Sequence, residues 1–418
     1  MYFAFKHQPS DFIVSEILPY ELSGNGDFFY IFFEKEKLNT MEIVLWICET
    51  MKLKREQLGI AGLKDKEGIT KQRLTISQKS LKTCGGKDQF LNFLKRKLRI
   101  LKTGWHEEPL AIGKNKGNHF EIRLRKREVL PTELKIKLES KLKKSKESWF
   151  PNAFGIQRFG KGNKNFKKAM KIFSGEETFK GGYEVKFKLQ AFGSMRFNAY
   201  VMKRRKEQAF LLDGDIMVNS WNAFGTGIAE YHGRKLQHFD YWKIKEEVGR
   251  KHFNIKGEKE WKANQNSLDC SSILVKDQVA NARDDKFLEP QHFLRSSDHN
   301  SELRFPTGPV LGIESLLARS GSEARKFDDW LITESGFDKK GIQISENYKL
   351  YGFRRPLWIK AQNLQWKWED NDLILNFSLP TGAYASIFLA NLLEEIDPKG
   401  CEANGLIIPE VKYTDLHK

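Results

Sequence analysis

The sequence predicts an α+β fold in which one domain interrupts another. Strand patterns come in hairpin pairs rather than in regular alternation with helices, which is typical of α+β proteins. Strand and helix patterns occupy both ends of the 418-residue chain, whereas the middle, from about Lys180, has a different texture. We therefore expect residues 1–179 and 351–418 to form one domain and residues 180–350 to be inserted into it.

The composition indicates a large core and a basic surface. Apolar residues make up 40% of the chain, and 31 residues are Phe. The net charge of +17 at pH 7 indicates a polyanionic partner, most often a nucleic acid. The alternative is a surface that is simply rich in lysine.

The cysteines and the apolar segments bear on location. Cys48, Cys84, Cys270 and Cys401 lie far apart, without zinc or redox spacing, so we expect reduced thiols. We see no signal peptide and no apolar run of the roughly 20 residues that span a bilayer. The expectation is a cytoplasmic protein without membrane segments.

The N-terminal elements surround a short turn. Residues 27–33 read as an aromatic-rich strand, and a helix begins at Asn39, with Glu42 three residues later as its capping partner. Residues 59–62 read as a short apolar strand end, and Leu74 and Ile76 indicate a second strand. Asp65 would then lie on the loop between them, where a side chain can project into a cleft.

Residues 119–125 alternate cleanly and read as a half-buried strand. A helix capped by Thr132 should follow, with Leu134, Leu138 and Leu142 facing inward and several lysines elsewhere. That basic helix could bind phosphates or could be a solvated face. Further on we expect a helix around Phe197, and the polar residues 241–304 show only weak periodicity.

The C-terminal part begins with a hairpin. Residues 364–368 and 373–379 both alternate, and residues 369–372 form the turn between them. Pro380, Thr381 and Gly382 break the second strand, and a helix containing Ile387 follows.

Several catalytic signatures are absent from the sequence. It has no GxxxxGK[ST] phosphate loop, no HExxH zinc helix and no complete dinucleotide fingerprint. We therefore expect no cofactor and no metal, so that a reaction would depend on ordinary side chains.

Three stretches could carry such chemistry. In the first, Asp65 lies between Lys64 and Lys66, and cations favour the carboxylate anion that a nucleophile needs. Such a turn is far more often simply solvated. The second, residues 151–166, is dense in Asn, Phe, Arg and Gly, as in loops that bind RNA, although a Phe-rich core is equally compatible. The third places Tyr384 where a strand gives way to a helix, either lining a cleft or buried in a core.

Together these stretches resemble the signature segments of the TruD family of tRNA pseudouridine synthases, in the family's order. The segments are AGLKDKEGITKQ, NAFGIQRFG and LPTGAYAS. Weaker similarities are KHQPSDFIVSE, KNKGNHFEIRLR, FPTGPVLG and GFRRPL.

The resemblance implies a pseudouridine-synthase catalytic domain built on a mixed, largely antiparallel sheet, with an inserted α+β TRUD domain. It implies isomerisation of a tRNA uridine, usually uridine 13, to pseudouridine. Asp65 matches the catalytic aspartate, which would attack either the ribose C1′ or the uracil C6. The other matched positions are Lys6 near that carboxylate, Asn152 and Phe154 of the N-x-F motif, and the base-stacking aromatic Tyr384. We expect Lys6 and Asn152 to act in catalysis beside Asp65, and Phe154, Tyr384, Gln157 and Arg158 to bind the substrate.

Two other functions remain open from the sequence. A non-catalytic RNA-binding or RNA-chaperone protein would use the same basic surface and aromatic loops. An RNA methyltransferase is disfavoured because no convincing glycine-rich cofactor loop is found. We expect tRNA as the partner and a monomer as the working form.

Overall fold

The computed structural model describes residues 1–64, 66–177, 183–218, 228–232, 235–239, 305–313, 315–335, 337 and 339–409. Their contacts divide the chain into two compact units. Unit 1 comprises residues 1–146, 361–385 and 395–404, and unit 2 comprises the described parts of residues 147–360, 386–394 and 405–418. Position 65 and the polar stretch 241–304 lie outside the described residues.

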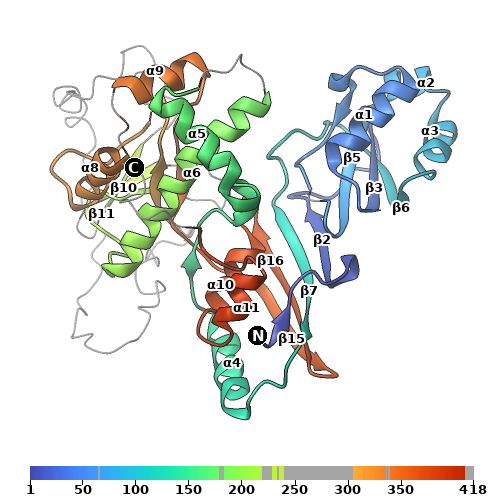
Figure 1. The fold of residues 1–418 in the computed structure, drawn as a ribbon. Coiled ribbons are helices and arrows are strands. Elements are labelled where there is room, and N and C mark those ends of the chain that lie inside the picture. Colours follow the sequence, from blue (N-terminus) through green and yellow to red (C-terminus); the bar gives the residue numbers. More distant parts are fainter. Residues whose placement is uncertain are drawn as a thin grey trace. The chain divides into compact units, whose positions relative to one another are not determined.

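Unit 1 is built on a mixed sheet of strand order β15-β16-β7-β2-β5-β3-β6 (Figure 1). The strands are β15 (Gln362–Glu369), β16 (Asp372–Pro380), β7 (Gly117–Lys126), β2 (Phe12–Ile17), β5 (Ile69–Ser77), β3 (Phe28–Glu36) and β6 (Arg99–His106). β2 and β5 run parallel, and the other neighbouring pairs are antiparallel. Two short strands extend the sheet, because β1 (Phe3–Ala4) pairs with β7 and β4 (Leu58–Gly59) pairs with β5. This confirms the expected α+β class and the largely antiparallel sheet.

Helices cover one face of the β3–β5 part of this sheet. Apolar side chains of β3 and β5, among them Ile31 and Leu74, pack with Ile43 and Ile47 of a helix into one buried cluster. That helix is α1 (Thr40–Met51), and it begins as expected at Asn39, whose side chain accepts a hydrogen bond from the Glu42 backbone. The other helices of unit 1 are α2 (Gln78–Thr83), α3 (Lys87–Leu94), α4 (Thr132–Ser145) and α11 (Pro398–Ala403).

Unit 2 contains a second, antiparallel sheet of strand order β11-β10-β9-β12-β13. Its strands are β9 (Ile216–Val218), β10 (Ile228–His232), β11 (Lys235–Phe239), β12 (Phe305–Val310) and β13 (Phe353–Pro356). The long helix α6 (Tyr183–Lys206) contains the helix expected around Phe197. Unit 2 also contains β8 (Phe150–Pro151), β14 (Trp358–Ile359), α5 (Lys164–Ser174), α8 (Glu323–Ser335), α9 (Lys339–Asn347) and most of α10 (Ala385–Leu393).

Most of the expected elements are confirmed, with one correction. The C-terminal hairpin is β15–β16, and the helix expected after its break is α10. Thr132 was expected to cap its helix, but it is the first helical residue, and Pro131 occupies the cap without a side-chain hydrogen bond. The helix forms because Leu138 and Leu142 are buried, which does not require a polar cap.

Within the described residues, no helix is both long and apolar enough to cross a membrane.

Candidate active site

The loop between β4 and β5 is fixed at residue 64. The Lys64 backbone N–H donates to Thr40 Oγ1 at 2.9 Å, and its Nζ donates to Asn118 Oδ1 at 2.5 Å. The same Nζ lies 3.8 Å from Glu16 Oε1, and the Lys64 side chain is only 8% exposed. Residue 64 is therefore tied to α1, β2 and β7 at once.

The other end of this loop packs against the opposite end of β2. A Cβ added to Gly68 would lie 2.6 Å from the backbone oxygen of Phe12, so only glycine fits there. The Nζ of Lys6 lies 4.1 Å from the centroid of the Phe12 ring. The structure thus places Lys6 near the Gly68 end of the loop and Glu16 near the Lys64 end.

The two lysines that flank position 65 have different surroundings. Lys64 is buried, as described above, whereas the Lys66 side chain is 56% exposed, and its Nζ lies 3.4 Å from Glu42 Oε1. Each lysine therefore has a carboxylate neighbour of its own, Glu16 for Lys64 and Glu42 for Lys66.

Glu16 is a buried carboxyl group that is only partly satisfied. Its Oε2 accepts a hydrogen bond from the Arg73 backbone at 3.1 Å, while its Oε1 has no hydrogen-bond partner among the described residues. Burial raises the pKa of the Glu16 carboxyl, and Lys64 and Arg73 offset only part of that rise. Of the two cations, Lys64 lowers this pKa more.

Tyr384 follows the turn at the end of β16. In the strand register, Leu379 of β16 lies opposite Asn118 of β7, so this turn starts beside the Lys64 partner. Thr381 Oγ1 donates to the Asn115 backbone oxygen at 2.6 Å, and Gly382 has a φ of 83°. Tyr384 itself is half-buried just before α10.

In unit 2, strand β13 holds the side chain of Asn152. Its Nδ2 donates to the Pro356 backbone oxygen at 2.9 Å, and its Oδ1 accepts from Arg355 Nη2 at 2.7 Å. Arg355 Nε also donates to the Asn152 backbone oxygen at 2.9 Å. One N–H and one lone pair of the amide remain for other partners, while the amide plane is fixed.

Phe154 of the same motif is buried, with 5% of its surface exposed. The Arg355 guanidinium carbon lies 4.2 Å from its ring centroid, and the Phe197 ring meets it edge-on at 5.7 Å. The Phe154 backbone N–H and C=O both bond the Asn198 amide. The structure therefore places Phe154 in the interior of unit 2, in contact with Arg355.

Gln157 and Arg158 lie on the following 3-10 helix (Ile156–Arg158). Gln157 is exposed, and its Oε1 accepts a bond from Ser386 Oγ at 3.4 Å. Arg158 donates from Nε to Ser194 Oγ and from Nη2 to Gln190 Oε1, both at 3.1 Å, so α6 orients its guanidinium.

Neither Arg355 nor Glu16 is assigned a role from the sequence, although both contact groups of the candidate site. Arg355 belongs to the GFRRPL segment, which is one of the weaker similarities to the family. A buried residue pair such as Arg355 and Asn152, 203 positions apart, leaves no periodic or spacing signal in a single sequence.

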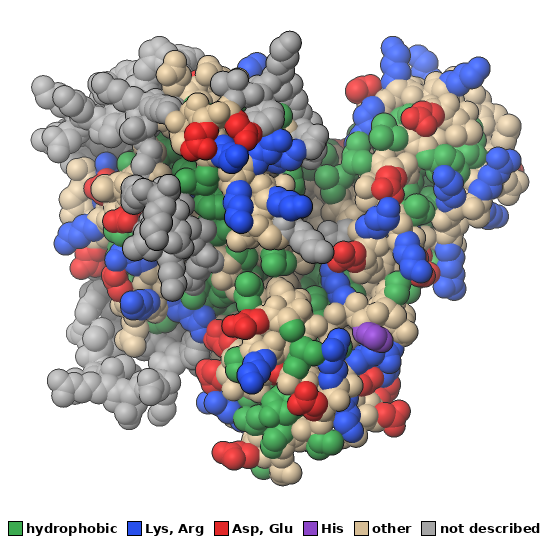
Figure 2. All heavy atoms as spheres, in the orientation of Figure 1, with side chains coloured by type: hydrophobic (Ala, Val, Ile, Leu, Met, Phe, Trp, Pro, Cys, Tyr) green, Lys and Arg blue, Asp and Glu red, His purple; other side chains and the backbone are tan. Residues whose placement is uncertain are grey.

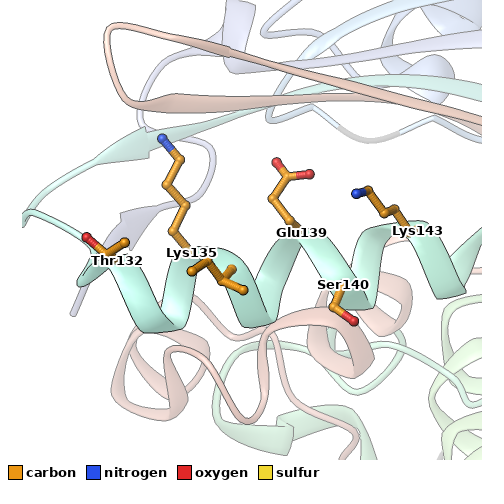
Figure 3. A pocket seen from close by; sticks show the side chains of 6 residues that line it. Thr132, Lys135, Glu139, Ser140 and Lys143 are labelled. Atoms are coloured by element: carbon orange, nitrogen blue, oxygen red, sulfur yellow. The ribbon is translucent and has the colours of Figure 1, made fainter.

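The lysine-rich helix α4 contacts its own unit. Lys137 and Lys141 both lie near Glu395, at 3.1 and 3.5 Å. Lys135 lies over the Trp368 ring at 4.6 Å, and Glu139 accepts hydrogen bonds from the indoles of Trp366 and Trp368. Figure 3 shows Lys135, Glu139 and Lys143 on one side of α4, where six residues line an open hollow of about 470 Å³. These contacts favour the solvated face over a phosphate-binding helix.

On the face shown in Figure 2, Lys and Arg side chains are spread among Asp and Glu rather than gathered in one continuous area. Across the described ranges, no group of three or more His, Cys, Asp or Glu residues could hold a metal ion.

Comparisons with known proteins identify the family. The model of the family described as tRNA pseudouridine synthase D (TruD) matches residues 3–180 and 271–392. A tRNA pseudouridine synthase D of Campylobacter jejuni (strain RM1221) is 30% identical over 397 residues, which cover 94% of this chain and 92% of the relative. One from Helicobacter pylori (strain J99) is 28% identical and covers 94% and 93%.

A solved structure supports the fold. The crystal structure of a TruD-type protein from Methanosarcina mazei superposes with a TM-score of 0.54 at 16% identity, over 96% of this chain and 94% of that one.

The sheet, the motif segments and these matches together define an RNA pseudouridine synthase, which is an isomerase. The chain belongs to the TruD family of tRNA pseudouridine synthases.

Proposed function

We propose that this chain converts a uridine of tRNA, at position 13, into pseudouridine with Asp65 as the nucleophile. The observation that carries the proposal is the tethering of the loop on either side of position 65. Lys64 is buried against Asn118 and Glu16, and Gly68 packs on Phe12. A solvated turn would leave its lysine in water, because burying an ammonium is costly.

The reaction is an isomerisation, so its atoms balance without a co-reactant. The target uridine leaves its stack, which costs a few kcal/mol. Asp65 attacks C1′ of the ribose or C6 of the uracil, and the C1′–N1 bond breaks. The base turns and a C1′–C5 bond forms, and the bond to Asp65 breaks, which frees the carboxylate. The proton on C5 then leaves and N1 gains a proton.

The other matched residues support this chemistry. Lys6 favours the anionic form of the nucleophile, and half-buried Tyr384 offers a ring to the unstacked base. Asn152 and Phe154 serve the site through the geometry that Arg355 imposes on them. Gln157 and Arg158 bind the RNA substrate.

The proposed assembly is simple. We propose a monomer that acts on tRNA in the cytoplasm. We also propose a catalytic domain of residues 1–179 and 351–418 with an inserted TRUD domain of residues 180–350.

Release of tritium from tRNA labelled at uracil C5 tests the nucleophile. We expect steady release by the wild type and a loss of roughly 10⁴-fold or more in Asp65→Asn, as for removal of other catalytic nucleophiles. Binding of the tRNA should be largely kept. Equal activity of the two proteins would remove Asp65 from the mechanism.

The same assay separates the enzyme from a pure binder. If the wild type binds tRNA but releases no tritium, the chain is an RNA-binding or RNA-chaperone protein on this scaffold. Mapping pseudouridine in the product tRNA tests position 13 independently, because modification elsewhere would leave the chemistry intact and change only the target.

A further inference from the structure

We propose that Lys64 is a positioning residue, which holds the loop carrying residue 65 on the sheet through its buried ammonium. The proposal rests on the proposed function, in which residue 65 is the nucleophile. It concerns the geometry of the loop rather than the charge of the nucleophile.

Several separate segments of the chain meet at residue 64. Its backbone N–H is bound by Thr40 of α1, and its ammonium by Asn118 of β7, with Glu16 of β2 at 3.8 Å. Thr40 in turn donates to Gln72 of β5 at 3.0 Å. Three neighbouring strands and one helix therefore fix a single loop residue.

The Lys64 side chain is buried rather than extended into water. A lysine on a loop normally extends its ammonium into water. Lys64 instead turns inward and is 8% exposed, beside a carboxyl that is 1% exposed. A buried pair of this kind adds little stability, but it can fix one arrangement of the chain.

Lys66 differs from Lys64 in its surroundings. The two lysines are equally far from position 65 in the sequence, because Lys64 comes directly before it and Lys66 directly after it. Lys66 is more than half exposed, and its contact with Glu42 is a surface ion pair, which has little effect on geometry. Substitution of Lys66 is therefore a matched control for substitution of Lys64.

The test compares Lys64→Met with Lys66→Met, which remove the same charge from opposite sides of residue 65. We expect kcat for tritium release to fall about 100-fold in Lys64→Met, the size of loss that a misplacement of about 1 Å causes. In Lys66→Met it should fall less than about fivefold. KM for tRNA should change less than about threefold in both variants.

Asn118→Ala separates positioning from electrostatics, since it removes the anchor of the ammonium and leaves every charge in place. We expect kcat to fall about tenfold, and the Lys64→Met, Asn118→Ala double variant to be no slower than Lys64→Met alone. The acidic limb of the pH profile of kcat should keep its midpoint in Asn118→Ala. An unchanged kcat in Asn118→Ala would overturn the proposal.

Further outcomes are decisive. Equal losses of kcat in Lys64→Met and Lys66→Met would show that only the charge of the lysines matters. A shift of the acidic limb of the pH profile in Asn118→Ala would show the same. If Lys64→Met does not fold, Lys64→Arg keeps the charge and should regain part of the activity. If Asp65→Asn is fully active, the proposed function fails. If Asp65→Asn is inactive while Lys64→Met and Lys66→Met have the same kcat, only the positioning role of Lys64 fails.

Discussion

A buried ion pair of unit 1 and one of unit 2 differ in how completely their groups are hydrogen-bonded. In unit 2, Arg204 and Asp215 are both fully buried, and their two hydrogen bonds measure 2.9 and 2.7 Å. In unit 1, the Lys64 ammonium lies 3.8 Å from Glu16, which is beyond hydrogen-bond distance, and Glu16 Oε1 has no partner among the described residues.

The Arg204–Asp215 pair is also local in sequence. Its two residues are 11 positions apart, and Arg204 Nε bonds the Ala209 backbone while Asp215 accepts from the Leu212 backbone. The whole network closes the turn between α6 and β9. Burial lowers the pKa of the Arg204 guanidinium, but Asp215 more than offsets it and the pKa is raised.

The Lys64–Glu16 pair joins segments that are far apart in the sequence, and Glu16 Oε1 accepts no hydrogen bond from the described part of the chain. A protein selected only for stability would pair such groups better or replace them with apolar residues. Removing one partner of the Arg204–Asp215 pair would leave a buried charge unpaired, so the intact pair matters for stability. Lys64 precedes the proposed nucleophile by one residue, so we expect its contacts to matter more for the geometry of that loop.

The largest effect on stability should come from breaking the Arg204–Asp215 pair. We expect Asp215→Ala to lower the free energy of unfolding of unit 2 by about 3–5 kcal/mol, because it leaves a buried guanidinium without its partner. Asp213→Ala is the control, since its pair with Arg319 is partly exposed and should contribute less than about 1 kcal/mol. Urea unfolding followed by circular dichroism measures both, and equal losses would contradict the assignment.

An intermediate effect should come from Arg355, a guanidinium that is bonded to neutral groups. Lysine in its place lacks the planar fork that reaches both oxygens of Asn152. We expect Arg355→Lys to cost about 1–3 kcal/mol of stability and to lower kcat at temperatures where the variant is folded. An Arg355→Lys protein with wild-type stability and wild-type kcat would show that the fork does not matter.

The sequence predicted the fold where the signal was local and periodic. The aromatic strand β3, the capped helix α1 and the hairpin β15–β16 were all expected from patterns within a few residues. Strands β2 and β5 pair in parallel because segments that are distant in the sequence pack together, and no pattern within β2 predicted that pairing.

For the candidate site, too, local motifs were predicted and contacts between distant residues were not. Motif resemblance indicated Lys6, Asn152 and Tyr384, which have positions in the described chain, and Asp65, which lies outside it. It did not indicate that Arg355 fixes Asn152 or that Glu16 faces Lys64, because those contacts join residues far apart in the sequence. Such partners depend on tertiary packing, which a single sequence does not display.

The smallest effect should be a change of stability with pH at Glu16. Its folded-state pKa is raised above 4.5, so the folded chain holds this proton more tightly than the unfolded chain does. The resulting stability is present below about pH 4.5 and is lost as pH rises through the folded pKa, by about 1.4 kcal/mol for each unit of the shift. Glu16→Gln cannot titrate, so its melting temperature relative to wild type should rise from pH 4 to pH 8.

Glu42→Gln gives the opposite sign and serves as the control. The backbone hydrogen bond from Asn39, together with Lys66, lowers the pKa of the exposed Glu42 carboxyl. Its stabilising contribution is present above about pH 4.5 and is lost as pH falls, so the variant should lose melting temperature relative to wild type as pH rises. Thermal unfolding of the three proteins across this range measures both trends. Parallel trends in the two variants would mean that Glu16 is not the under-satisfied member of its pair, and the contrast with Asp215 would then fail.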